Sequence, residues 1–169
     1  MSLFALVGLP NSGKSALFNA LTKNRQRVAN FPGITVEKKQ GKTNFQDQEI
    51  DIVDLPGVYT LDAASLDEKV TRDYILNKRK EEKADVLVLV VDSTNLKKSL
   101  YLALQIKELG QKFVVALNMM DIAEKRGLKL DLDKLSKMLG AKVVPTVAVA
   151  SKGVDQLMLA CLEEKAKPA

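Results

Sequence analysis

The 169-residue sequence contains no histidine and only one cysteine, Cys161. An internal disulfide bond is therefore excluded, and so is a zinc site built from histidine and cysteine ligands. The pairs in which histidine activates a serine or cysteine nucleophile are excluded as well. Any bound metal must accordingly have oxygen ligands, and any catalysis must rest on positioning, metal charge and backbone dipoles.

Long apolar runs are also missing, because the run at 86–91 is far shorter than the roughly 20 residues that a membrane-spanning helix needs. The N-terminus lacks the charged-then-apolar layout of a signal peptide, so we expect a cytoplasmic location. The formal net charge is +5, but the lysines are dispersed and no aromatic residues are interleaved with them. We interpret them as a solvated surface and expect no nucleic-acid partner.

A glycine-rich stretch near the start of the chain, 8–15, matches the pattern G-x-x-x-x-G-K-[ST] without a mismatch. Its residues are Gly8, Leu9, Pro10, Asn11, Ser12, Gly13, Lys14 and Ser15. In such a loop the backbone N–H groups surround phosphate oxygens, the lysine meets the β- and γ-phosphates, and the Ser15 hydroxyl ligates Mg²⁺. The alternative interpretation is a turn followed by a surface lysine.

Hydrophobic periodicity predicts strands and helices that alternate along the whole chain. Strands are expected at 4–7, 36–45, 49–53, 86–91, 113–117 and 143–149, and helices at 14–22, 65–77, 96–109, 130–139 and 154–165. The alternation predicts a single three-layer α/β domain over 1–169. Its sheet is expected to have six mostly parallel strands with one antiparallel edge strand, 36–45.

Two further motifs follow predicted strands, where ligands bind in a parallel sheet. In the first, Asp54 is placed to hold Mg²⁺ and Gly57 to offer its N–H to a γ-phosphate, with Leu55 and Pro56 between them. By itself, this motif also fits an ordinary turn.

The second motif comprises Asn118, Met119, Met120 and Asp121, and it has the N-x-x-D spacing that recognises guanine. The Asp121 carboxylate can accept hydrogen bonds from the guanine N1–H and 2-amino group, whereas adenine offers no such pair of donors. The alternative interpretation is a helix cap after a strand.

Taken together, these motifs resemble the GTP-binding domain of FeoB-type ferrous iron transporters over nearly the whole chain. The segments that carry the resemblance are Asn11 in the phosphate loop, 25–28, 33–37, 54–59, 65–68, 92–96 and 116–123. The resemblance implies a Ras-like P-loop GTPase fold that binds GTP and GDP and hydrolyses GTP slowly.

The family also implies a switch I at about 28–37 and a switch II that begins at Asp54. Switch I would contribute Gly33, Ile34, Thr35, Val36 and Glu37 to the nucleotide site. The expected catalytic residues are Asn11, Lys14, Thr35 and Gly57, and the expected Mg²⁺ ligands are Ser15, Thr35 and Asp54.

The resemblance further implies that this chain is a fragment of a transporter in the bacterial inner membrane. Its partner would be the membrane iron-transport domain of the same protein, and a helical regulatory domain would also be missing. A homo-oligomer is a further expectation. Two rival interpretations are an RNA- or ribosome-associated GTPase and a non-catalytic guanine-nucleotide sensor.

Three positions depart from the common GTPase pattern. Met119 replaces the usual lysine of the guanine motif, so a thioether would pack against the base. The last base-contacting loop is assigned to Val147, Ala148 and Val149, with a shifted alternative at 150–152. Val58 replaces the glutamine that orients water in Ras-like proteins.

Because Val58 cannot orient water, other groups must supply charge at the phosphates. In the wider group of GTPases, asparagine at the position of Asn11 accompanies stimulation by potassium, so the resemblance implies K⁺ as a second cofactor. Asn11 and the carbonyl groups near Ala29 and Phe31 would hold the ion. The alternative role for Asn11 is to stabilise the loop.

Overall fold

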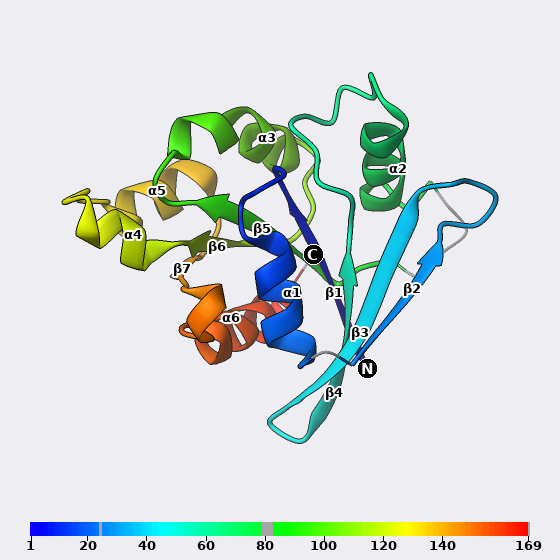
Figure 1. The fold of residues 1–169 in the computed structure, drawn as a ribbon, viewed down its shortest axis with the longest axis horizontal. Coiled ribbons are helices and arrows are strands. Elements are labelled where there is room, and N and C mark those ends of the chain that lie inside the picture. Colours follow the sequence, from blue (N-terminus) through cyan, green and yellow to red (C-terminus); the bar gives the residue numbers. More distant parts are fainter. Residues whose placement is uncertain (24, 79–82, 169) are drawn as a thin grey trace.

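The computed structural model describes residues 1–23, 25–78 and 83–168. A seven-stranded sheet with the order β2-β3-β4-β1-β5-β6-β7 forms the middle layer (Figure 1). The strands are β1 (Ser2–Gly8), β2 (Gln26–Asn30), β3 (Glu37–Phe45), β4 (Gln48–Asp54), β5 (Val86–Asp92), β6 (Phe113–Asn118) and β7 (Val143–Pro145). Only β3 runs antiparallel to its neighbours, β2 and β4, while the remaining pairs are parallel.

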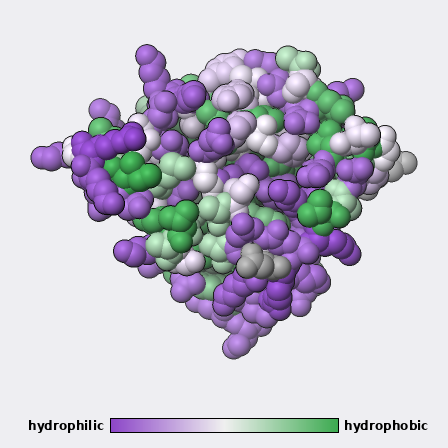
Figure 2. Space-filling model, viewed as in Figure 1, coloured by the Kyte–Doolittle hydropathy of each residue, from purple (hydrophilic) through white to green (hydrophobic). Residues whose placement is uncertain are grey.

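Helices cover both faces of this sheet (Figure 1). Within the described residues they are α1 (Lys14–Thr22), α2 (Leu66–Ile75), α3 (Leu96–Glu108), α4 (Met120–Lys125), α5 (Leu132–Leu139), α6 (Val154–Ala166) and a short 3₁₀ helix, η1 (Ala148–Ala150). None of the helices in this part of the chain is long and apolar enough to span a membrane. Hydrophilic side chains dominate the face in Figure 2, and the hydrophobic ones lie in small separate groups.

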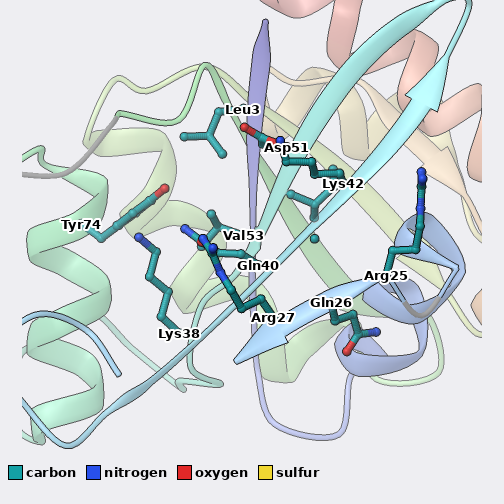
Figure 3. Close-up of a pocket in the computed structure, with 12 residues that line it drawn as sticks. Leu3, Arg25, Gln26, Arg27, Lys38, Gln40, Lys42, Asp51, Val53 and Tyr74 are labelled. Atoms are coloured by element: carbon teal, nitrogen blue, oxygen red, sulfur yellow. The ribbon is translucent and has the colours of Figure 1, made fainter. Parts of the chain in front are cut away.

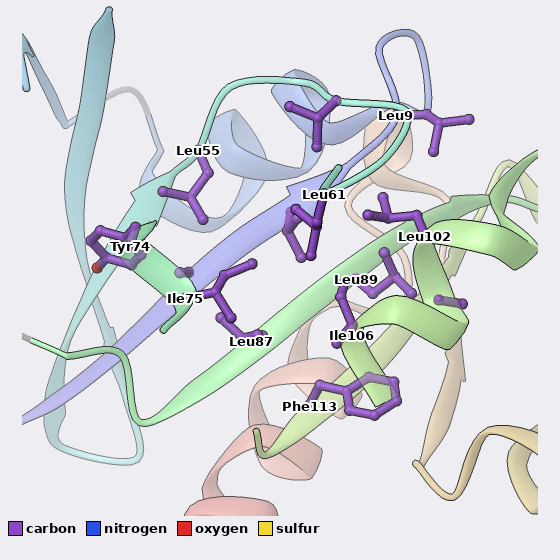
Figure 4. Packing of buried hydrophobic residues seen from close by; sticks show 14 of the residues in the cluster. Leu9, Leu55, Leu61, Tyr74, Ile75, Leu87, Leu89, Leu102, Ile106 and Phe113 are labelled. Carbon is purple, nitrogen blue, oxygen red and sulfur yellow. The ribbon is translucent and has the colours of Figure 1, made fainter. Parts of the chain in front are cut away.

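The core has two halves, because successive side chains of a buried strand point to opposite faces of the sheet. In β5, Val86, Val88 and Val90 pack on the face covered by α1 and α6. Leu87 and Leu89 pack on the other face, with residues of α2 and α3 (Figure 4). The uninterrupted apolar run of β5 thus reflects burial on both sides, as is typical of a central parallel strand.

Local signals account for two of the element boundaries. The Ser65 hydroxyl accepts a 3.1 Å hydrogen bond from the Glu68 N–H, so Ser65 caps the start of α2, within the helix predicted at 65–77. Gln46 and Asp47 both have positive φ, 50° and 61°, and they form the turn between β3 and β4, which separates the strands predicted at 36–45 and 49–53. This turn closes a hairpin that extends beyond the body of the sheet (Figure 1).

The predicted fold class is confirmed, but the sheet has one strand more than expected. The sequence predicted no strand between the helix at 14–22 and the strand at 36–45, whereas Gln26–Asn30 is strand β2, at the sheet edge beside β3. All five of its residues are exposed, so β2 carries no apolar alternation that the sequence could reveal. The antiparallel strand β3 is consequently internal, and the edge position predicted for it is wrong.

The last predicted strand is too long by four residues. Instead of 143–149, β7 ends at Pro145, and the chain turns into η1 directly afterwards. A proline cannot donate a hydrogen bond to a sheet, so it commonly marks a strand end. The sequence also predicts a charged connector at 78–83, of which 79–82 lie outside the described residues.

Candidate nucleotide-binding site

The parallel strands bring the three predicted motifs to one edge of the sheet. Gly8 ends β1, Asp54 ends β4 and Asn118 ends β6, and each is followed by a loop. Because β1, β4, β5 and β6 run in the same direction, their carboxyl ends meet at this edge. Segments more than 100 residues apart in the chain therefore form one site.

The first loop turns tightly between β1 and α1. Asn11 and Gly13 both adopt left-handed backbone conformations, with φ of 66° and 87°. A Cβ atom on Gly8 would lie 2.7 Å from the carbonyl oxygen of Val90, so glycine is required by the close approach of β5. This loop directs the N-terminus of α1 toward the site, where its free N–H groups favour anions.

Lys14 is buried, contrary to the surface-lysine alternative. Its side chain forms an ion pair with Asp54 and donates a hydrogen bond of 2.6 Å to the carbonyl oxygen of Leu55. Lys14 is 8% exposed and Asp54 5%. The two charged groups predicted for phosphate and metal binding thus lie in direct contact.

A cavity of about 380 Å³ opens around this ion pair. Residues of the phosphate loop, of the predicted switch I and of the predicted start of switch II line this cavity. Its lining consists of Lys14, Ser15, Thr35, Val36, Glu37, Lys39, Asp54, Leu55, Pro56, Gly57 and Asp67. Lys39 and Asp67 were not predicted from the motifs.

The Asn118 side chain joins the phosphate loop to the segment that follows β7 through hydrogen bonds. Its Nδ2 donates a 3.2 Å hydrogen bond to the carbonyl oxygen of Ser12. Its Oδ1 accepts bonds from the Thr146 hydroxyl at 3.1 Å and from the Ala148 N–H at 3.0 Å. Asn118 is only 3% exposed, so this buried amide ties three loops together.

The sequence of this chain is similar to that of known proteins over most of its length. A family model described as "Ferrous iron transport protein B" matches residues 2–161. The Fe(2+) transporter FeoB of Escherichia coli K12 is 47% identical over 165 residues, which cover 95% of this chain and 21% of that protein. These matches decide the family. The chain belongs to the FeoB family.

Solved structures of FeoB proteins agree with this assignment. The cytosolic domain of the T. maritima FeoB iron transporter in its GMPPNP form matches with a TM-score of 0.94 and 44% identity. That match covers 100% of this chain and 66% of the other. The separate G domain of T. maritima FeoB matches with a TM-score of 0.88 and 44% identity, over 97% of this chain and 98% of that one. The P-loop GTPase fold is therefore confirmed, and this chain spans about a fifth of its curated relative.

In this FeoB-family chain, the guanine motif continues from Asn118 into α4. Met119 adopts a left-handed conformation with φ 62°, and Asp121 lies half-buried in the first turn of the helix. The Met120 N–H donates a 3.3 Å hydrogen bond to the carbonyl oxygen of Thr146. Thr146, which no motif indicated, therefore holds both ends of the loop that carries Asn118.

The predicted last base loop contacts the guanine motif through Ala148. The Ala148 N–H bonds to Asn118, while Val149 is 84% exposed. The shifted alternative, 150–152, folds back on Val147, which exchanges backbone hydrogen bonds of 3.0 and 3.1 Å with Lys152. Of the two segments, 147–149 is the one joined directly to Asn118.

Residues 31–36, within the predicted switch I, form a tight turn between β2 and β3. The Phe31 N–H donates a 2.8 Å bond to the Val36 carbonyl, and Gly33 has φ 78° with nothing near its would-be Cβ. Thr35 is exposed and lines the cavity. Phe31 is buried at 1% exposure.

Asn11 and Val58 both lie outside the lining of the phosphate cavity. Asn11 is exposed on the loop surface. Val58 is 3% exposed and turned into the core, and its N–H donates a 3.1 Å bond to the Gly8 carbonyl. The residue after Gly57 therefore contributes packing and no polar group.

A larger cavity, of about 740 Å³, lies along β2, β3 and β4 (Figure 3). It is bordered by Arg27 on β2, Lys38 and Lys42 on β3, Asp51 on β4 and Tyr74 on α2. None of the predicted site residues lines it, so size alone does not locate the site of this protein.

Reactive cysteine chemistry is absent from the site. Cys161 lies in the core between the sheet and α6, and burial raises the pKa of its thiol. The thiol therefore stays protonated and unreactive.

No group of three or more acidic, histidine or cysteine side chains that could hold a metal occurs among residues 1–23, 25–78 and 83–168. Magnesium beside phosphates needs no such group, since hydroxyls, one carboxylate and phosphate oxygens suffice.

Proposed function

We propose that this chain binds GTP with Mg²⁺ and hydrolyses it slowly, as the regulatory switch of a ferrous iron transporter. The carrying observation is the hydrogen bond from Asn118 to Ser12, which joins the base-recognition motif directly to the phosphate loop. A nucleotide joins its base to its phosphates through one sugar, and direct contact between the two motifs supports the binding of both ends by this site. Membership of the FeoB family supports the role in iron transport.

At the phosphate end of the nucleotide site, each residue has a separate role in this proposal. Lys14 exchanges its contact with Asp54 for the β- and γ-phosphates, and the Gly57 N–H faces the γ-phosphate. Ser15, Thr35 and Asp54 offer the oxygen ligands that suit Mg²⁺. The ion, when bound, neutralises charge on the phosphate oxygens.

The base end selects guanine. Asp121 accepts from the guanine N1–H and 2-amino group, and Asn118 contacts N7. Met119 packs against the base plane. The segment 147–149 offers a backbone N–H to the guanine O6, and the bond from Ala148 to Asn118 supports its position beside the base.

Catalysis in this proposal relies on positioning and cations, because Val58 supplies no polar group. Thr35 and Gly57 order the γ-phosphate and its surroundings. Asn11 and carbonyls near Ala29 and Phe31 would hold a potassium ion, which would supply transition-state charge where other GTPases use an arginine. The exposed position of Asn11 on the loop leaves its amide accessible to such an ion.

We further propose that residues 1–169 form one G domain within a longer transporter of the bacterial inner membrane. The span of 21% of the E. coli relative supports this view. The domain would lie on the cytoplasmic side and couple to the iron-conducting part of the same protein. Assembly of the full protein into a homo-oligomer completes the proposal.

Nucleotide affinities test the central claim. The chain is expected to bind GTP and GDP far more tightly than ATP, and Asp121→Asn should shift the preference toward xanthine nucleotides, because the amide can donate to the xanthine 2-oxygen. Equal affinity for ATP and GTP would refute the proposal. Single-turnover hydrolysis separates an enzyme from a non-catalytic sensor, which would bind GTP without converting it.

A further inference from the structure

Strand β3 places a second lysine in the cavity that surrounds Lys14 and Asp54. Lys39 lines this cavity together with Thr35 and Gly57. In the β3–β4 pair it stands directly opposite Asp54, so the two side chains lie on the same face of the sheet, with Cβ atoms about 5 Å apart.

The position of Gly41 identifies this face independently. Gly41 lies two residues beyond Lys39 and therefore on the same face of β3. A Cβ atom on Gly41 would lie 2.4 Å from the Thr22 side chain on α1. Lys39 thus projects toward the helix whose N-terminus carries Lys14 and Ser15.

The charges that line the cavity are unbalanced. Its lining includes three carboxylates, on Glu37, Asp54 and Asp67, against two ammonium groups, on Lys14 and Lys39. The formal sum is −1, and without Lys39 it would be −2. An incoming triphosphate is strongly anionic, and a bound Mg²⁺ would offset only part of its charge, so repulsion from the excess carboxylate remains in this partly buried site.

Other groups near the γ-phosphate position do not supply this charge. Val58 is apolar and buried. Lys14 is bound to Asp54 and Leu55 in this structure, and when it moves to the phosphates as proposed above, Lys39 is the lysine of the lining that remains beside Asp54. A lysine suits the role because its ammonium is a compact charge on a flexible stem that can follow a moving phosphate.

We propose that Lys39 is a phosphate-binding residue that acts at the γ-phosphate end of the cavity and favours GTP over GDP. This inference rests on the proposed function, which assigns Thr35 and Gly57 to that end. Lys39 shares the cavity with both, so its charge acts more strongly on a γ-phosphate than on the phosphates of GDP. The residue thereby contributes to the discrimination between the two states of the switch.

The test measures dissociation constants for GDP and for a non-hydrolysable GTP analogue, both with Mg²⁺, by equilibrium titration. Lys39→Met removes the charge and keeps the apolar stem, and Lys39→Arg keeps the charge. Lys42→Met is the matched control, because Lys42 lies on the same strand but on the opposite face of the sheet. There its Nζ atom lies 3.0 Å from the Glu49 Oε1 atom. Circular dichroism establishes that each variant is folded, and Lys39→Gln replaces Lys39→Met if the latter is not.

We expect Lys39→Met to weaken binding of the GTP analogue about tenfold and binding of GDP less than about threefold. Lys39→Arg should restore most of the difference, and Lys42→Met should change neither constant. An unchanged ratio of the two constants in folded Lys39→Met, or an equal loss for both nucleotides, would overturn the inference. If the unaltered chain bound neither guanine nucleotide, the proposed function itself would fail, which is a separate outcome.

Discussion

Replacing Gly13 by alanine tests whether the contact between Asn118 and the phosphate loop is as tight as the structure indicates. Gly13 has φ +87°, and an added Cβ atom would lie 2.0 Å from the Asn118 Nδ2. No real Cβ atom approaches a side chain so closely, so the buried amide must move. The same substitution at Gly127 is a matched control, because φ is +71° there and nothing lies within 4 Å of the added atom.

The expected magnitude follows from these contacts. An alanine in the left-handed region costs about 1 kcal/mol, which is the whole cost expected for Gly127→Ala. Displacing Asn118 also breaks its bonds to Ser12, Thr146 and Ala148, each worth about 1 kcal/mol net. Gly13→Ala should therefore lower the free energy of unfolding by about 4 kcal/mol, a large part of the roughly 5–15 kcal/mol of a typical domain.

Urea unfolding of the nucleotide-free protein, followed by circular dichroism, measures both values. A double-mutant cycle with Asn118→Ala isolates the collision, since without the amide Gly13→Ala should cost only about 1 kcal/mol. The reasoning is refuted if Gly13→Ala and Gly127→Ala destabilise the protein equally. It is refuted as well if the cost of Gly13→Ala is the same with and without Asn118.

Three further outcomes are expected. Lys14→Ala should lower the free energy of unfolding of the nucleotide-free chain by about 3 kcal/mol, because it leaves Asp54 buried and unpaired, and Lys14→Ala combined with Asp54→Ala should recover part of that loss in urea unfolding. Asn11→Ala should abolish the stimulation of single-turnover GTP hydrolysis by potassium relative to sodium while GTP affinity changes less than about threefold, and equal stimulation in both proteins would contradict the cation site. Burial raises the pKa of the Cys161 thiol, so the folded chain keeps a proton that the unfolded chain loses above about pH 8.5. The free energy of unfolding should therefore fall more steeply above that pH in the native protein than in Cys161→Ala, and parallel pH profiles would contradict this linkage.

The chemistry of the site could be predicted from the sequence because phosphate loops depend on local geometry. The segment 8–15 contains its own turn, cation and hydroxyl, and helix α1 begins and ends where its periodicity predicted, at Lys14 and Thr22. The apolar run at 86–91 likewise predicted a central strand, since only burial on both faces tolerates such a run.

Strand β2 could not be predicted, because its pairing with β3 is a tertiary event and its five exposed residues carry no periodic pattern. Thr146 could not be predicted as a site residue for a related reason. It matters only because the end of β7 meets the end of β6, where its hydroxyl reaches Asn118. Neither position belongs to a motif, and both depend on how the strands are ordered in the sheet.

The sequence by itself determined which groups this protein can use: a phosphate loop, a guanine motif and oxygen ligands, with no histidine and no second cysteine. These properties reside in residue types and short spacings, which a folded chain cannot change. The tertiary structure alone decided which of them meet. It buried Lys14 against Asp54, turned Val58 into the core and brought Lys39 opposite Asp54, because strand register sets which side chains share a face.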